Sequence, residues 1–120
     1  SDVQLAAAEA QRAATQAVVR GALRTARGRY EAARSRLALF DAALLRGARQ
    51  EREAALAAYG AGDLSLIELI DFERALSRAE IERTRARVDA ADALVQLLSA
   101  AAGTGGETLT LPGTASDDER

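Results

Sequence analysis

From Val19 onward, apolar or small side chains follow one another at alternating spacings of four and three residues. The members of this row are Val19, Leu23, Ala26, Tyr30, Ala33, Leu37, Phe40 and Leu44. Such a heptad repeat lines up on one side of an α-helix, where a second helix can cover it. No proline interrupts the row, because the single Pro of the chain stands at position 112. The pattern therefore predicts a long helix in a coiled coil.

The row loses its register after Leu44. Gly47 and Glu51 occupy the next heptad positions, and the apolar residues move to a neighbouring stripe of Leu45, Ala48, Ala55, Leu56 and Tyr59. This shift fits a helix pair that locally unwinds. Gly21, Gly28 and Gly47 each cost about 1 kcal/mol relative to Ala inside a helix. We therefore expect that the helix bends at these glycines or that another backbone comes close to them.

A second helix is predicted after Gly62. Ser65 is a suitable N-cap, and Glu68 stands three residues later, as in a capping box. The helix carries two apolar stripes. One is a second heptad row of Ile81, Thr84, Val88, Ala91, Val95 and Leu98; the other holds Leu69, Phe72, Leu76 and Ala79, and Leu94 and Leu97 lie beside the first. Two stripes on one helix suggest two neighbours, as in a bundle or a helical barrel.

The predicted fold is all-α, a long antiparallel two-helix coiled-coil hairpin over residues 1–103. Its helices span about 3–59 and 65–102, with a turn at 60–64, and the first helix would be about 85 Å long. Gly103 should end the second helix, because glycines, Pro112 and an acidic end follow it. Residues 104–120 are expected to form a flexible, disordered tail.

The two heptad rows are expected to face each other across the hairpin. If the turn is centred on Gly62, the numbers of paired residues sum to about 124. Phe40 then lies opposite Thr84, and Leu23 lies opposite Ala101. About half of the hydrophobic fraction of 48% is alanine, and aromatic residues make up 3%. This composition favours close pairing of two helices over a thick core.

Charge and chemistry exclude several classes of function. The net charge of −2 gives no electrostatic case for nucleic acid. Residues 1–58 carry ten Arg and six acids, a net of +4, and residues 66–102 carry five Arg and seven acids, a net of −2. Antiparallel pairing brings these opposite signs together. The chain has no His and no Cys, so it lacks the commonest general base, metal ligand and nucleophile. We expect a protein that is not an enzyme and binds no metal or cofactor.

The turn carries the most specific motif. Residues 59–71 read YGAGDLSLIELID, which resembles the second-repeat hairpin turn of TolC-like outer-membrane efflux proteins. The pattern in that family is close to Tyr-x-x-Gly-(Glu/Asp)-x-Ser-Leu-(Leu/Ile)-Glu-Leu-(Leu/Ile)-Asp, usually followed by Ala-Gln-Arg. Here Phe72, Glu73 and Arg74 follow, so two of these three residues depart from the pattern. The flanking helices also resemble that family, particularly its heavy-metal efflux branch, over most of residues 5–103.

The resemblance implies a function that spacing alone does not. Proteins of this family are trimers whose strands form a barrel in the outer membrane and whose long helices continue it as a periplasmic α-barrel. This chain matches only the two helices of the C-terminal repeat. It would then be a periplasmic segment of an outer-membrane channel, the exit duct of a tripartite efflux pump. Its expected partners are a periplasmic adaptor protein, an inner-membrane pump and two further copies in the full-length trimer.

The same resemblance assigns roles to the turn. The expected adaptor-docking tip comprises Gly60, Ala61, Gly62, Asp63, Leu64, Ser65 and Leu66. Exposed apolar residues at a helical tip favour an interface. Alternatively, Leu64, Leu66 and Ile67 fold back onto Leu56 and Tyr59 as a hydrophobic staple.

An entrance constriction is implied at Tyr59, Glu68 and Asp71. In the family, acids at the two latter positions point into the periplasmic mouth, where threefold symmetry makes each a ring, and the tyrosine helps to hold it shut. The alternative for Glu68 and Asp71 is a capping box and a first-turn acid stabilised by the helix dipole, worth about 0.3–1 kcal/mol. Tyr59 would then only pack at the helix end.

Two other functions fit a helical hairpin. A periplasmic adaptor has a coiled-coil hairpin of similar shape, but lipoyl-like β segments flank it, and neither end of this sequence supplies one. A soluble helical scaffold without a transport role would need only the hairpin itself. Strand-forming segments upstream of Ser1 in the gene would distinguish the channel from the scaffold.

Overall fold

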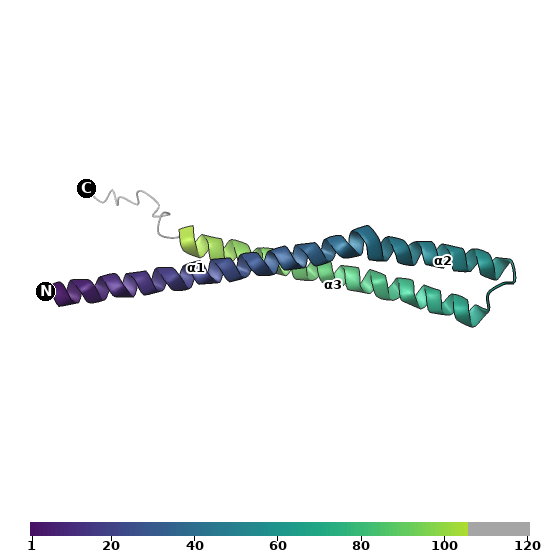
Figure 1. The fold of residues 1–120 in the computed structure, drawn as a ribbon, viewed down its shortest axis with the longest axis horizontal. Helices are drawn as coiled ribbons and strands as arrows, with labels where there is room; N and C mark the ends of the chain where they lie inside the picture. Colours follow the sequence, from purple (N-terminus) through teal and green to yellow (C-terminus); the bar gives the residue numbers. More distant parts are fainter. Residues whose placement is uncertain (106–120) are drawn as a thin grey trace, which may run out of the picture.

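The protein forms a long helical hairpin in a computed structural model that describes residues 1–105. Helix α1 (Asp2–Leu39) runs through a short π-helical turn, η1 (Phe40–Leu44), into α2 (Leu45–Gly60). Helix α3 (Leu66–Gly105) returns antiparallel to them (Figure 1). The predicted all-α hairpin is confirmed, and its helix ends differ from the predicted ones by one to three residues. Helix α3 continues to Gly105, two residues past the predicted stop, and residues 106–120 of the predicted tail lie outside the described part.

The hairpin is a rod with a thin interior. It extends 88 Å along its longest axis, and its radius of gyration is 26.7 Å, whereas a compact chain of this length has about 14 Å. The start of α1 projects past the end of α3 (Figure 1), and residues 2–18 are all exposed. The buried residues are Ala26, Leu45, Ala55, Leu69, Ala86 and Ala93. Most of them are alanines, so the two helices pack closely along a narrow seam.

The first predicted row lies on the inner face, but it ends at Phe40 and not at Leu44. Leu44 is 47% exposed, whereas Leu45 is only 3% exposed. The reason is η1, in which the backbone N–H of Leu45 bonds to the carbonyl of Phe40, five residues earlier. A π-helical turn holds one residue more than an α-helical turn. The inner face therefore passes from Phe40 to Leu45, and this explains the register shift seen in the sequence.

In α2 the inner face continues through Ala48, Arg52 and Ala55, which are half-buried or buried. The neighbouring stripe predicted from the sequence was correct for Leu45, Ala48 and Ala55. It was wrong for Leu56 and Tyr59, which are 46% and 42% exposed. Both residues stand in the last two turns of α2, close to the hairpin turn.

The predicted pairing of the two heptad rows was wrong for α3. Ile81, Val88 and Val95 are 52%, 62% and 64% exposed, and Leu98 is 61% exposed. The stripe that begins at Leu69 faces α1 and α2 instead. It continues through Phe72, Leu76, Ala79, Arg83, Ala86, Ala90, Ala93, Leu97 and Ala100, all of which are buried or half-buried. Its small members allow close approach of the helices, and this outweighs the larger area that the Ile81–Leu98 row would bury.

The lengthwise register of the hairpin is nevertheless the predicted one. Arg83 donates from Nε to the Asp41 carboxylate, and these residue numbers sum to 124. Arg52 Nε lies 2.7 Å from Glu73 Oε1, with a sum of 125. Thr84 thus lies level with Phe40 but on the far side of α3. Arg52–Glu73 joins a base of residues 1–58 to an acid of residues 66–102 as expected, whereas Arg83–Asp41 has the opposite arrangement. Exposed ion pairs of this kind add little stability.

Candidate functional site: the hairpin tip

Helix α2 ends in a tight, fully bonded turn. The Gly62 N–H donates to the Tyr59 carbonyl over 3.0 Å, and the Asp63 N–H donates to the Ala58 carbonyl over 2.9 Å. These two bonds define a Schellman motif, which needs a left-handed residue at its centre. Gly62 has φ = 81° and supplies that conformation without the steric cost of a Cβ atom. The glycine at this position therefore sets where the chain reverses.

Helix α3 begins with the capping box predicted from the sequence. The Glu68 N–H donates to Ser65 Oγ over 3.2 Å, and the Ser65 N–H donates to Glu68 Oε2 over 2.9 Å. Each side chain satisfies a backbone donor that has no partner inside the helix. Only Leu64 separates this box from the last residue of the Schellman motif. Hydrogen bonds thus cap both helix ends at the tip, and they hold the short turn rigid.

The capping bonds change the chemistry of Glu68. The backbone and side-chain hydrogen bonds with Ser65 lower the pKa of the Glu68 carboxyl below its usual value of 4.5. A lowered pKa in the folded state means that this contact adds stability above the unfolded pKa. That contribution is lost as the pH falls through the lowered value. The capping interpretation of Glu68 is therefore correct for the single chain.

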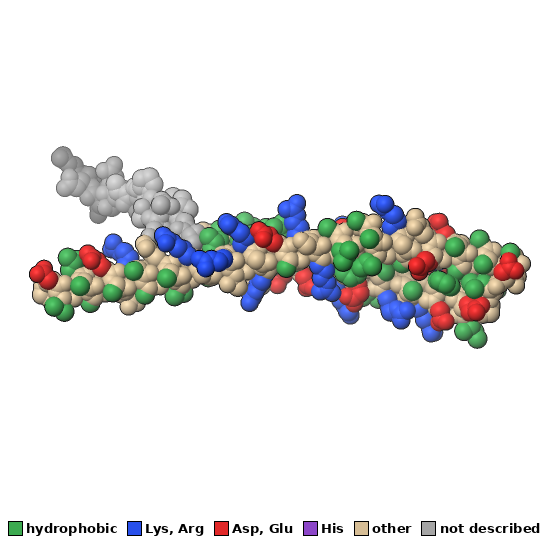
Figure 2. All heavy atoms as spheres, in the orientation of Figure 1, with side chains coloured by type: hydrophobic (Ala, Val, Ile, Leu, Met, Phe, Trp, Pro, Cys, Tyr) green, Lys and Arg blue, Asp and Glu red, His purple; other side chains and the backbone are tan. Residues whose placement is uncertain are grey.

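The apolar side chains of the tip do not form a closed staple. Leu66 is 54% exposed and Ile67 is 75% exposed. Leu64 is half-buried, and Leu69, on the inner face, takes the buried position behind the turn. Figure 2 shows hydrophobic side chains on the surface at the turn end of the molecule. An exposed apolar tip on a rigid turn is typical of an interaction surface.

The residues of the predicted constriction are all exposed at this end. Tyr59 is 42% exposed near the end of α2, and both Glu68 and Asp71 are exposed on the first turns of α3. The spacing of three places the two carboxylates on one side of α3. Their role in a constriction stays a prediction.

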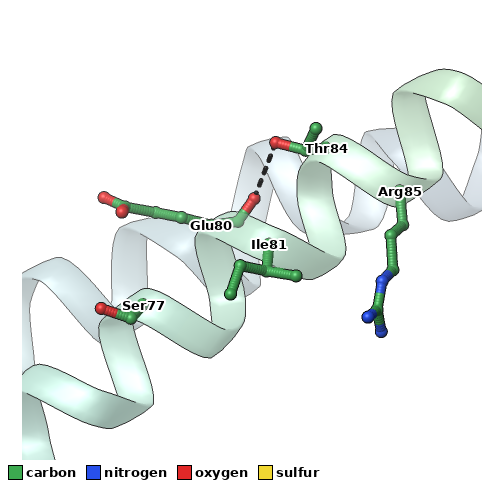
Figure 3. A pocket seen from close by; sticks show the side chains of 5 residues that line it. All are labelled: Ser77, Glu80, Ile81, Thr84 and Arg85. Atoms are coloured by element: carbon green, nitrogen blue, oxygen red, sulfur yellow. Dashed lines mark hydrogen bonds between the residues drawn. The ribbon is translucent and has the colours of Figure 1, made fainter.

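Away from the tip, open hollows lie along the described part of the rod. One of them lies along α3 and is lined by Ser77, Glu80, Ile81, Thr84 and Arg85 (Figure 3). It is a shallow groove beside the exposed Ile81. Within residues 1–105 no group of three or more acidic side chains is placed to hold a metal ion. In the same part of the chain, the helices lack a stretch long and apolar enough to cross a lipid bilayer.

Comparisons of the chain with known protein families, with curated proteins and with solved structures found no match.

Proposed function

We propose that this hairpin is a periplasmic segment of a TolC-like outer-membrane channel and serves as part of the exit duct of a tripartite efflux pump. The observation that carries the proposal is the tip, where the family-like motif forms a rigid turn that holds Leu66 and Ile67 in solvent. The 88 Å rod also suits a duct wall better than a compact domain. In this role the hairpin does passive work and has no catalytic step. The periplasmic adaptor docks at the tip, and the pump is reached through the adaptor.

The two alternatives require different surfaces. An adaptor hairpin would present its tip to a channel and belong to a chain with lipoyl-like β segments. A scaffold hairpin would have no reason to keep Ile67 at 75% exposure. The channel proposal is preferred because the turn motif resembles that of the channel family residue by residue, and because α3 has apolar surface for a second neighbour.

The tip is tested by introducing a charge at its most exposed apolar residue. Ile67→Glu in the full-length protein should abolish cross-linking to the adaptor and efflux, because a desolvated carboxylate costs several kcal/mol at an apolar interface. The fold should not change, since the side chain has no packing role in the hairpin. Photocross-linking from the tip and growth in the presence of the exported compound give the two measurements.

A matched control lies at the other end of the rod. Val3 is 78% exposed on the projecting part of α1, so Val3→Glu adds the same charge far from the tip. Val3→Glu should retain adaptor cross-linking and efflux. If Ile67→Glu behaves like Val3→Glu, the tip is not the docking surface and the channel proposal loses its main support.

We further propose that Glu68 and Asp71 line the mouth of the assembled trimer. Three like carboxylates in a narrow ring repel one another, and at Glu68 this repulsion opposes the lowering of the pKa that Ser65 causes. Glu68→Gln with Asp71→Asn should therefore reduce cation selectivity and block by trivalent ions in single-channel recordings. If the acids only stabilise the start of α3, helix stability falls slightly while selectivity and block both survive.

A further inference from the structure

A hollow beside the π-helical turn carries an excess of positive charge. Its lining residues are Asp41, Leu45, Arg46, Arg49 and Arg83. Three arginines and one aspartate give this lining a net charge of +2. The groove shown in Figure 3 differs, because one glutamate and one arginine leave its lining without net charge. Since a recess lined by charges of one sign concentrates ions of the other sign, the hollow beside η1 favours an anion.

The π-helical turn brings the residues of this hollow together. Its extra residue carries Leu45 onto the inner face, where the side chain is 3% exposed and lies at the bottom of the hollow. Asp41 belongs to the turn itself, and Arg46 and Arg49 follow within the first two turns of α2. Arg83 comes from α3. Single π-helical turns inside α-helices are frequent at functional sites, and here one places charged groups from three elements around one leucine.

Asp41 holds Arg83 in place and leaves part of its guanidinium for another acceptor. The Arg83 Nε donates to Asp41 Oδ1, and the Arg83 side chain is 30% exposed. This contact uses Nε, so the two terminal nitrogens of the guanidinium take no part in it. Guanidinium nitrogens donate in a fixed planar fork that matches the oxygens of a phosphate. The contact therefore fixes Arg83 and compensates the charge of Asp41.

The two arginines of α2 have no carboxylate partner in the hairpin. Neither Arg46 nor Arg49 forms an ion pair within residues 1–105. Glu53 stands four residues after Arg49, the spacing at which opposite charges meet on a helix, and still forms no ion pair with it. Glu73, on α3, pairs with Arg52 instead. Two positive charges at the hollow therefore remain for a ligand.

We infer that this hollow binds the phosphoryl group of a small phosphomonoester between Arg46, Arg49 and Arg83. A phosphomonoester carries a charge of about −1.5 to −2 at neutral pH and has three strong acceptor oxygens, which suits a lining with a net charge of +2. The volume of about 200 Å³ is smaller than the pockets of about 300–1,000 Å³ that hold drug-sized ligands. The inference goes beyond the proposed efflux role, since one hairpin supplies every residue of the hollow.

Titration calorimetry with glycerol 3-phosphate, at neutral pH and constant ionic strength, tests the site. The unmodified chain should bind one equivalent with a saturating isotherm. Arg49→Gln should weaken this binding about tenfold, because it removes one charge-assisted contact to the phosphoryl group. Arg49 is exposed, so the helical signal in circular dichroism should not change. Arg24→Gln is the matched control: it removes the same charge from an exposed arginine of α1 that lies outside the hollow, and it should bind like the unmodified chain.

Further probes separate the phosphoryl group from charge in general and from a lipid surface. Inorganic phosphate should compete with glycerol 3-phosphate, whereas acetate at the same ionic strength should not. Vesicles that contain phosphatidate present the same group on a membrane. Retention of the chain on these vesicles without saturable binding of glycerol 3-phosphate would overturn the small-molecule site. Equal affinities of Arg49→Gln and Arg24→Gln, or an isotherm of the unmodified chain that never saturates, would also overturn it and leave adaptor docking at the tip to its own test.

Discussion

Leu45→Ala should lower the free energy of unfolding by about 2–3 kcal/mol, whereas Leu44→Ala should change it by less than about 0.5 kcal/mol. The two leucines are neighbours in sequence and identical in chemistry. They differ in burial, because Leu45 is 3% exposed and Leu44 is 47% exposed. Leu45 is also the only residue larger than alanine that is buried on the α1–α2 side of the described hairpin, so its truncation leaves a cavity.

Urea unfolding followed by circular dichroism gives both values from the midpoint and slope. The pair of variants is its own control, since each removes the same atoms from adjacent helical positions. Equal losses for the two variants, or a larger loss for Leu44→Ala, would mean that the inner face continues through Leu44. The π-helical turn at Phe40–Leu44 would then not be formed in solution.

Much of the hairpin was predictable because its signals are local. The heptad row from Val19, the glycine at position 62 and the Ser65–Glu68 box each depend on residues within one or two helical turns. The lengthwise register followed from the position of the turn alone. In two antiparallel helices joined by a short turn, residues equally far from the turn lie at the same level. Asp41 with Arg83 and Arg52 with Glu73 confirm it.

The inner face of α3 was not predictable in the same way. Two heptad rows run along this helix, offset by two residues, so they lie on opposite sides. The row with Ile81 and Val88 has the larger side chains, so hydrophobicity favours burial of that row. The structure buries the row with Ala86 and Ala93 instead, because alanine allows the helices to approach closely. Hydrophobicity alone favours the row that would bury the larger apolar area. Close approach of two helices depends instead on the shapes of the side chains on both helices.

At the tip, too, the local features were predictable and the packing was not. The position of its turn and its capping bonds were predicted from Gly62, Ser65 and Glu68. Whether Leu66 and Ile67 cover the turn or point to solvent depends on packing beyond the local sequence, and the two possibilities were left open. The two apolar stripes of α3 predicted two neighbours for this helix, and the stripe that includes Ile81 and Val88 is the one left exposed.

Deleting Ala43 should be nearly neutral for stability, within about 1 kcal/mol of the unmodified chain, although it removes a residue from the middle of a long helix. The deletion takes the extra residue out of the π-helical turn. Phe40 and the former Leu45 are then four residues apart, which is the spacing that an α-helix needs to keep both on one face. Ala43 is exposed, so its removal takes little packing away.

The same deletion elsewhere in α1 should be far more costly. Removing Ala32, which is also an exposed alanine, turns every residue before it by about 100° relative to α3. Leu23 and Tyr30 then leave the inner face, and the loss of their burial should cost about 3 kcal/mol or more in unfolding free energy. Thermal and urea unfolding of the two deletion variants compare them directly. A large loss for the Ala43 deletion would show that the π-helical turn is needed for packing, and a small loss for the Ala32 deletion would show that α1 does not interlock with α3.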